Sequence, residues 1–518
     1  MRRYAITSVS VAACLALLSC APKPPPLPPA EIWPQAGWQT STPEAQGVDS
    51  ATLAKAVQTL KANNVPIHSL LVERNGYIVL DAYFFPFANN EPHDVASITK
   101  SVTSMVVGIA MNGNSAIDLN APVSSLMPGQ LTTDPRKSQI TLGELLSMTS
   151  GLDCSVDQGR SVLAEMESMP HWADYMMNRP LAAAPGTRFD YCGGSMHVVA
   201  TALTRMTGQS VATVARNDLF APLGISDVVW PSDPDGVSHG FADLRLEPRD
   251  LAKLGYLWLH DGRWQDKQII PAGYLKDALA PHANVQAGIQ YGYGMWLYPG
   301  HTPYDFEANG RGGQRITVIP YLNAVIVVTG GGLDANVVTP LIAAAFKDKK
   351  PLPANVPGDA QLAGVVSGVA APPVAVASAA SPELSYLLAS RTWFLPPNPL
   401  GIQSLTFSFP AAADGMVRFG YASGVAEDHP IGLDGSPRLS QNASTGLPVA
   451  VSGRWSGDSF ELTYDEVARI DAYKLVVTPA PGGLSIHLSE RSGLANMMLT
   501  ATEQPPAQRV AGVAVSQR

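Results

Sequence analysis

The stretch Val95-Ala96-Ser97-Ile98-Thr99-Lys100-Ser101-Val102 opens a predicted helix over residues 96–113, and it contains the only Ser-x-x-Lys in the chain. Positions three apart share one face of a helix, so the amine of Lys100 is expected beside the hydroxyl of Ser97. A lysine whose pKa is lowered can take the proton of such a serine. The first N–H groups of the helix could stabilise an oxyanion. The pattern is short enough to recur by chance, so it needs partners elsewhere in the chain.

The composition excludes several classes of function. The 518 residues are enough for two or three domains with a sizeable core. Hydrophobic content of 46% and charged content of 15% are typical of a globular protein, and a net charge of −9 argues against nucleic acid as a partner. The chain has no phosphate-binding or dinucleotide fingerprint, no zinc motif and no Gly-x-Ser-x-Gly elbow. The sequence therefore implies no cofactor and no metal.

The N-terminus predicts export. Residues 1–20 have a charged start and an apolar core too short to span a bilayer, as in a signal peptide. They end in Leu17-Leu18-Ser19-Cys20, which resembles the lipobox of bacterial lipoproteins. The resemblance implies a lipid anchor on Cys20 in the bacterial cell envelope and, with Ala21 next, the outer membrane facing the periplasm. A plain secretory signal is the alternative. The proline-rich residues 21–37 predict a stiff stalk.

Hydrophobic periodicity predicts an α+β domain over residues 38–348. Strands are expected at both ends of this domain and helices between them, which favours an antiparallel sheet flanked by helices with an inserted helical region. The elements predicted from the sequence are a helix over 49–63, a β-hairpin over 67–84 with its turn at Asn75-Gly76, a mainly helical region over 160–290, strands over 291–298, 316–320 and 324–329, and a helix over 333–347.

Three further segments follow this domain. Residues 349–382 are rich in Pro, Ala, Val, Gly and Ser, which predicts a flexible, partly extended linker. Residues 383–503 contain several runs that alternate at period two, so we expect an all-β sandwich or barrel. Residues 504–518 are predicted to be a disordered tail.

Two more motifs carry candidate chemistry. Tyr191 follows Pro185-Gly186-Thr187 and precedes Cys192. A tyrosine near a lysine can shuttle a proton, although most tyrosines are hydrogen-bonded core residues. The second motif is Arg311-Gly312-Gly313-Gln314, where glycines could let a substrate lie close to an edge strand. A glycine-rich turn is the simpler interpretation of this motif alone.

Taken together and in this order, Ser97-x-x-Lys100, Tyr191 and Arg311-Gly312-Gly313 resemble the serine hydrolases related to class C β-lactamases and D,D-peptidases. The esterase and 6-aminohexanoate-dimer hydrolase branch is the most similar. Flanking segments agree with the resemblance, which covers about residues 40–347 and implies a β-lactamase-like fold. These segments are Leu145-Leu146-Ser147-Met148-Thr149-Ser150-Gly151-Leu152-Asp153, Pro185-Gly186-Thr187 and Glu247-Pro248-Arg249-Asp250-Leu251-Ala252.

The resemblance implies a role for each motif. Ser97 would be the nucleophile that forms an acyl-enzyme, and Lys100 and Tyr191 would share the acid–base role as one coupled system. The backbone N–H groups of Ser97 and Gln314 would form the oxyanion hole. The segment Arg311, Gly312 and Gly313 would bind substrate, with Arg311 holding a substrate carboxylate or supporting Tyr191 electrostatically.

Two departures from the family pattern bear on the substrate, a small molecule or a peptide. Gly193 stands where relatives have an asparagine, and Arg311 stands where they have lysine or histidine. Both changes weaken the case for an efficient β-lactamase more than the case for an ester or amide hydrolase. A β-lactamase or D-amino-acid peptidase acting on cell-wall peptides remains an alternative. A catalytically silent penicillin-binding-like protein is another, although the intact Ser97, Lys100 and Tyr191 speak against it.

Four cysteines remain to be assigned. Cys14 lies in the signal and Cys20 in the lipobox, which leaves Cys154 and Cys192. In an oxidising compartment these two could form a disulfide or stay as separate buried thiols. The family resemblance places the loop before Cys154 near the active site, where a bridge to Cys192 would tie it to the tyrosine segment. That placement favours the disulfide.

Overall fold

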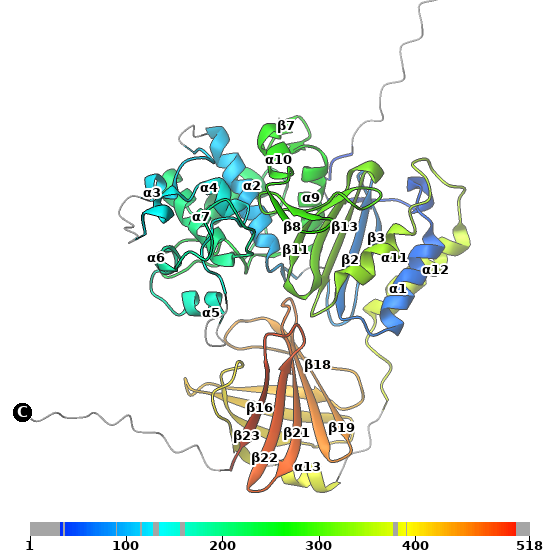
Figure 1. The fold of residues 1–518 in the computed structure, drawn as a ribbon. Coiled ribbons are helices and arrows are strands. Elements are labelled where there is room, and N and C mark those ends of the chain that lie inside the picture. The colour runs from blue at the N-terminus through cyan, green and yellow to red at the C-terminus, as the bar shows by residue number, and fades with distance from the viewer. Residues whose placement is uncertain are drawn as a thin grey trace, which may run out of the picture.

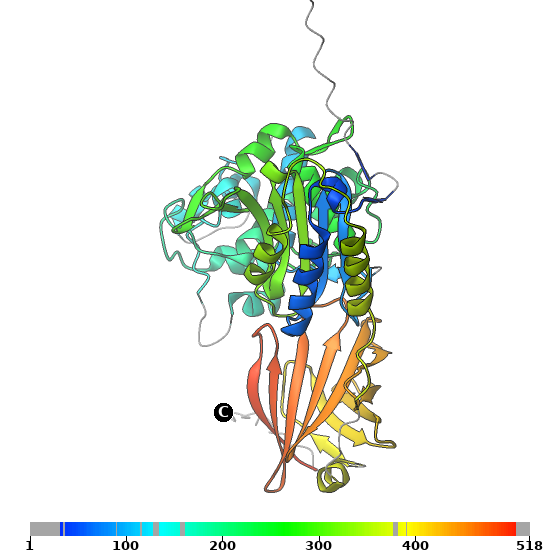
Figure 2. The ribbon, with the colours of Figure 1, turned by 90° about the vertical axis from the view of Figure 1, so that its right-hand side faces the viewer.

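The chain forms two domains stacked one on the other (Figure 1) and seen from the side in Figure 2. This computed structural model describes residues 32–34, 37–89, 91–113, 117–127, 134–155, 161–376, 382–389 and 391–503. The predicted signal with Cys20, most of the stalk and the tail over 504–518 lie outside the described residues. Within the described ranges, no helix has the length and apolar character needed to cross a membrane.

The first domain is built on a nine-stranded sheet in the order β1-β3-β2-β13-β12-β11-β10-β9-β8. Only the β1–β3 pair is parallel. The predicted hairpin is confirmed as β2 and β3, whereas the single strand predicted over 291–298 is wrong, because β9 and β10 form a hairpin whose turn includes Gly294 at φ +73°. The strands are β1 (Gln39–Thr40), β2 (Ile67–Arg74), β3 (Tyr77–Tyr83), β8 (Ala283–Gln286), β9 (Ile289–Tyr291), β10 (Trp296–Tyr298), β11 (Asp305–Gly310), β12 (Gln314–Ile319) and β13 (Ala324–Gly330).

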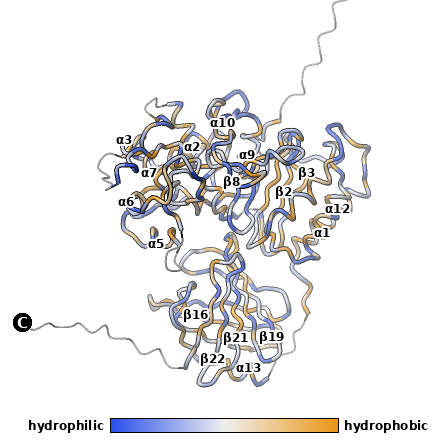
Figure 3. Tube along the Cα trace, in the orientation of Figure 1, coloured by the Kyte–Doolittle hydropathy of each residue, from blue (hydrophilic) through white to orange (hydrophobic). Residues whose placement is uncertain are grey.

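Helices cover both faces of this sheet. Along β2, Leu70 and Val72 face one hydrophobic core while Leu71 faces another, so alternate side chains bury opposite faces. Figure 3 shows the hydrophobic character of this strand. One face packs on α1 (Ser50–Ala62), α11 (Val338–Ala343) and α12 (Val356–Ala370), and the other packs on α2 (Ile98–Gly113) and α9 (Pro248–Leu259). The predicted α+β class is confirmed.

The linker prediction is wrong for α12. The side chain of Asn355 caps this helix by accepting a hydrogen bond from the N–H of Gly358 at 3.2 Å. The helix packs on α1 and β3 and buries Leu362 and Val369. Its Ala, Val and Gly residues resemble the composition of a linker. A helix can pack on a neighbouring helix with few large side chains, so composition alone did not reveal it. At the other boundary, Trp33 packs edge-on against Tyr256, so the domain begins before residue 38.

The second domain is a nearly closed barrel rather than a sandwich. Its strand order is β14-β15-β16-β17-β19-β20-β21-β22-β23, with β18 paired to β19, and a bridge between Phe394 and Thr502 brings the two ends together. Buried Phe407, Phe419 and Phe460 fill its interior. The strands are β14 (Thr392–Phe394), β15 (Ile402–Ser408), β16 (Asp414–Tyr421), β17 (Ala426–Gly432), β18 (Arg438–Gln441), β19 (Pro448–Ser456), β20 (Ser459–Glu466), β21 (Ala472–Ala480), β22 (Gly483–Glu490) and β23 (Asn496–Ala501).

Two connections of the barrel contact the first domain. The β20–β21 loop buries Ala468 and Ile470, and the carbonyl of Ala468 accepts a hydrogen bond from the N–H of Asp94 at 2.9 Å. A side chain on Gly312 would collide with Ile470, so these two residues are in close contact. The β22–β23 turn supplies Ser492 to the same region. The barrel therefore reaches both the segment that precedes the Ser-x-x-Lys motif and the Arg311–Gly312 segment.

Candidate functional site

A short strand and a strained residue position Ser97. Strand β4 (His93–Asp94) pairs with β5 (Arg245–Leu246) and leads into α2. Between them Ala96 adopts φ +45°, which is unfavourable for an alanine and is common at functional sites. Its N–H donates to Asp94 Oδ1 at 2.7 Å, which holds the turn. Ser97 is thus presented at the start of α2, where the first N–H groups have no partner within the helix.

Lys100 is a buried amine beside this serine. Its Nζ lies 2.7 Å from Ser97 Oγ and 2.9 Å from the carbonyl oxygen of Phe241, and the residue is 2% exposed. Among the described residues no carboxylate is within ion-pair distance of it. Burial lowers the pKa of Lys100 to about 7, against the opposing charge of Asp243. A substantial fraction of this amine is therefore neutral near pH 7.

Tyr191, from another part of the chain, contacts both Ser97 and Lys100. Its hydroxyl hydrogen-bonds Ser97, and its ring centroid lies 4.9 Å from Lys100 Nζ. Burial of the hydroxyl raises the pKa of Tyr191 to about 12, with the hydrogen bond to Ser97 acting in the opposite direction. The residue as a whole is 38% exposed, so its ring forms part of an open surface. At neutral pH the side chain is a phenol and can donate a proton.

The segment Arg311–Gly313 is in contact with the barrel. The guanidinium of Arg311 lies 2.8 Å from Asp471 Oδ1, hydrogen-bonds Ser492 and lies 4.0 Å from Glu490. All three partners belong to the barrel, so the cation is already paired, and its predicted role of holding a substrate carboxylate stays a prediction. Sequence reasoning missed Asp471 because the residues are 160 positions apart.

The two glycines of this segment make room for protein rather than substrate. Gly312 has φ +77° and Gly313 has φ +94°, a region that favours glycine. A side chain on Gly312 would collide with Ile470 of the barrel, and one on Gly313 would collide with Leu333. Both glycines therefore permit close packing of protein, and their predicted substrate-binding role stays a prediction.

Gln314 lies at the closing pair of the β11–β12 hairpin, opposite Gly310. Its side-chain amide accepts a hydrogen bond from the N–H of Gly330 at 3.1 Å and donates to the carbonyls of Gly330 at 2.5 Å and Arg311 at 3.1 Å. Gly310 is the residue that meets the nucleophile segment, because a Cβ placed on it would lie 3.2 Å from the Cβ of Ala96. The first backbone N–H after this contact is that of Arg311. Gln314, whose N–H is predicted to complete the oxyanion hole, follows three residues later, and that role stays a prediction.

The structure gives Gly193 a packing role. It begins α7 (Gly193–Thr207), and a Cβ there would meet the side chain of Leu163 at about 3.1 Å. The family resemblance implies that the asparagine of relatives would hold the lysine. Here the carbonyl of Phe241 makes the second contact to Lys100. A backbone carbonyl has no signature in a sequence, so nothing could have identified it beforehand.

Aromatic rings form one wall of the site around Tyr191. Its ring centroid lies 5.6 Å from that of Trp296, and Trp296 lies 5.1 Å from Tyr291. Phe189 joins the cluster 5.4 Å from Tyr291. Such rings favour an apolar group of a substrate.

Cys154 and Cys192 are bonded to each other, with their Cα atoms 5.6 Å apart. The bridge ties the segment after Gly151-Leu152-Asp153 to the residue that follows Tyr191. The N–H of Asp190 also donates to the carbonyl of Met148 at 2.8 Å. Two connections thus fix the tyrosine segment against the 148–154 segment. In the described ranges, no three His, Cys, Asp or Glu side chains cluster as metal ligands would.

Comparisons with known proteins show which proteins this chain is similar to. The β-lactamase family matches residues 53–341. The 6-aminohexanoate-dimer hydrolase of Paenarthrobacter ureafaciens is 24% identical over 284 residues, covering 50% of this chain and 71% of that protein. Two solved structures are similar at TM-scores of 0.48 and 0.47. One is a family VIII carboxylesterase at 18% identity, covering 59% of this chain and 98% of that one. The other is the octameric penicillin-binding protein homologue of Pyrococcus abyssi at 15%, covering 87% and 99%.

Proposed function

Because this chain belongs to the β-lactamase family of hydrolases, we propose that it cleaves an ester or amide bond through an acyl-enzyme on Ser97. One observation carries the proposal. A buried Lys100 amine with no carboxylate partner among the described residues lies 2.7 Å from the hydroxyl of a serine at a helix start. Such an amine is partly neutral at physiological pH and can act as a base.

The geometry supports a mechanism in which Lys100 and Tyr191 each carry out a different proton transfer. Neutral Lys100 takes the proton of Ser97 as its oxygen attacks the substrate carbonyl. Tyr191, a phenol at neutral pH, donates its proton to the leaving group and regains one from the Lys100 ammonium. The N–H of Ser97 and, by its position after Gly310, the N–H of Arg311 would receive the oxyanion. A water molecule then attacks the acyl-enzyme with the same proton transfers, which frees Ser97 and releases the acyl group as a carboxylic acid.

The surroundings of the site favour a substrate without a carboxylate. Penicillins and cell-wall peptides carry one, and the cation placed to receive it, Arg311, is paired with Asp471 and lies near Glu490. The rings of Tyr191 and Trp296 suit an apolar acyl or leaving group. The relative from Paenarthrobacter is named a 6-aminohexanoate-dimer hydrolase. A dimer of this amino acid is joined by an amide and ends in a carboxylate, so the likeness supports cleavage of an amide and does not bear on the absence of a carboxylate.

A fluorophosphonate probe followed by peptide mass spectrometry tests the nucleophile. We expect one label on Ser97 and turnover of neutral p-nitrophenyl esters that is lost in Ser97→Ala. Ser125→Ala is the matched control, because Ser125 is an exposed serine of the same domain. Failure to label Ser97 would refute the enzyme and leave the silent penicillin-binding-like alternative. Faster turnover of nitrocefin than of any ester or amide would instead make the protein a β-lactamase.

A further inference from the structure

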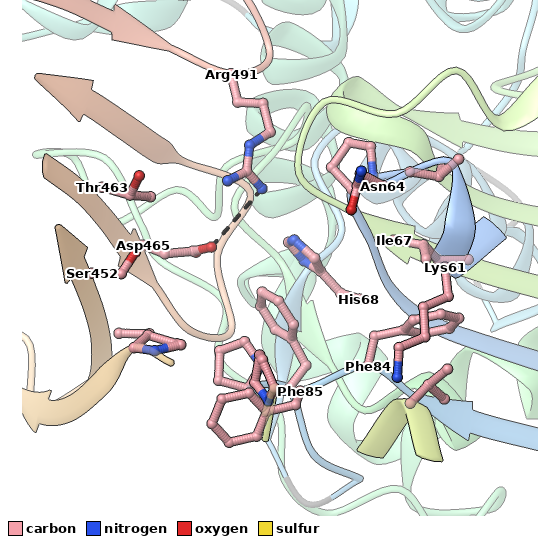
Figure 4. A pocket seen from close by; sticks show the side chains of 18 of the residues that line it. Lys61, Asn64, Ile67, His68, Phe84, Phe85, Ser452, Thr463, Asp465 and Arg491 are labelled. Carbon is pink, nitrogen blue, oxygen red and sulfur yellow. Dashed lines mark ion pairs between the residues drawn. The ribbon is translucent and has the colours of Figure 1, made fainter. Parts of the chain in front are cut away.

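A cavity of about 360 Å³ lies between the two domains. The end of the β2–β3 hairpin and the segment after α12 form one wall, and the barrel forms the other (Figure 4). Its apolar lining includes Phe84, Phe85 and Phe87, and its polar lining includes His68, Asp465 and Arg491. This volume and this mixture of aromatic rings with a few polar groups are typical of small-molecule sites, which often lie between domains. None of these residues belongs to the Ser97 site.

Two polar side chains of the cavity have acceptor atoms without a hydrogen-bond donor. His68 Nε2 and Asp465 Oδ1 are buried, and among the described residues neither receives a hydrogen bond. Arg491 forms a long ion pair with Asp465, its guanidinium 4.0 Å from Asp465 Oδ2, which is beyond hydrogen-bond length. Figure 4 shows His68 pointing toward Asp465 and Arg491 from the opposite wall. A buried acceptor without a donor is costly, so this arrangement favours a ligand that donates.

Neighbouring contacts determine which nitrogen of His68 is free. His93 Nδ1 lies 2.7 Å from the carbonyl of Asp94, which can only accept, so Nδ1 carries the proton of His93. His93 Nε2 is therefore an acceptor, and His68 Nδ1, 2.8 Å away, donates to it. Burial lowers the pKa of His93 to about 4 and that of His68 well below its usual value, so both rings are neutral. The Nε2 of His68 is therefore unprotonated, and its lone pair can accept a hydrogen bond.

We propose that this cavity binds a free α-amino acid with an apolar side chain. Arg491 would receive the carboxylate, Asp465 and the lone pair of His68 would receive the ammonium, and the side chain would lie among Phe84, Phe85 and Phe87. An α-amino acid carries its two charges one carbon apart, which suits a cation and an anion 4.0 Å apart. A neutral ligand would form no ion pair with Arg491, and a simple carboxylate would leave Asp465 and His68 without a donor.

Isothermal titration calorimetry on the full chain tests the site with three related probes. L-Phenylalanine carries both charges, 2-phenylethylamine lacks the carboxylate, and 3-phenylpropionate lacks the ammonium. We expect saturable binding of phenylalanine at one site per chain and at least tenfold weaker binding of each truncated probe. These comparisons use the unaltered protein, so they do not depend on the folding of a variant. Absence of phenylalanine binding at 10 mM, or equal affinity for all three probes, would overturn the proposal.

Variants locate the binding. Asp465→Asn and Arg491→Gln should each weaken phenylalanine binding at least tenfold. Arg454→Gln, on an exposed part of the barrel outside the cavity, should leave it unchanged. Protein whose Ser97 is blocked by fluorophosphonate should bind phenylalanine as before, which separates this site from the proposed hydrolase site. Loss of binding on blocking Ser97, or full affinity in both cavity variants, would show that the ligand sits elsewhere.

Discussion

Lys100 and Arg311 are two cations beside the same Ser97 segment, and their environments are opposite. Lys100 is buried, contacts a hydroxyl and a carbonyl, and has a pKa lowered to about 7. Arg311 is partly exposed and is paired with Asp471 of the other domain. Burial without an ion-pair partner turns a cation into a base, whereas pairing keeps a cation charged and fixed. The same neighbourhood therefore contains one cation suited to chemistry and one suited to holding two domains together.

The largest effect is expected at Lys100. Lys100→Arg keeps the positive charge but cannot supply a neutral amine, so kcat/KM for a neutral ester should fall about a thousandfold, within the range for loss of a general base. Lys100→Met should be equally inactive. Lys137→Arg is a matched control, because Lys137 is also buried and donates to a carbonyl, that of Met177. An active Lys100→Arg enzyme would mean that charge rather than basicity is what the site needs.

Tyr191→Phe separates the hydroxyl of this residue from its ring. The ring contact with Lys100 at 4.9 Å is kept, while the proton donor is lost. We expect kcat to fall about a hundredfold with little change in KM, since proton donation is worth this order of rate. Tyr291→Phe, in the same aromatic cluster, serves as the control. Near-normal turnover in Tyr191→Phe would show that this residue only packs against Lys100 and donates no proton.

The pH dependence of kcat/KM tests the lowered pKa directly. The active form of Lys100 is neutral, so activity should be constant above pH 7 and fall about tenfold per pH unit well below it. Asp243 opposes the shift through its charge, so Asp243→Asn should move the inflection to lower pH. Asp266→Asn, at an exposed position, should leave it in place. A shift to higher pH in Asp243→Asn would contradict the electrostatic explanation.

The sequence predicted the features that depend on short stretches of chain. Helical spacing placed Lys100 beside Ser97, and the Asn75-Gly76 turn located the β2–β3 hairpin. The family resemblance associated Tyr191 with this pair, which spacing alone could not do. Features that depend on distant contacts were missed, including the carbonyl of Phe241 at Lys100 and the pairing of Arg311 with Asp471.

The barrel shows why the glycine-rich motif is open to more than one interpretation. Glycines at positive φ beside an arginine are compatible with a substrate site, with a turn or with close protein packing. The choice depends on what lies opposite, and for Gly312 it is Ile470, which is distant in the sequence. Alternation at period two predicted an all-β domain correctly, but it carries no information on where that domain packs.

The smallest effect is expected from breaking the Arg311 pair. Asp471→Asn removes the carboxylate 2.8 Å from Arg311 and leaves Ser492 and the more distant Glu490. The guanidinium should then attract a substrate carboxylate, so benzylpenicillin should inhibit ester hydrolysis several-fold more strongly. Asp428→Asn, which breaks an exposed pair with Arg418 elsewhere on the barrel, is the control and should leave inhibition unchanged. KM for the neutral ester should stay within twofold, since that substrate has no carboxylate. If instead both substrates change equally, Asp471 acts only by holding the domains together, and the charge of Arg311 has no part in selecting the substrate.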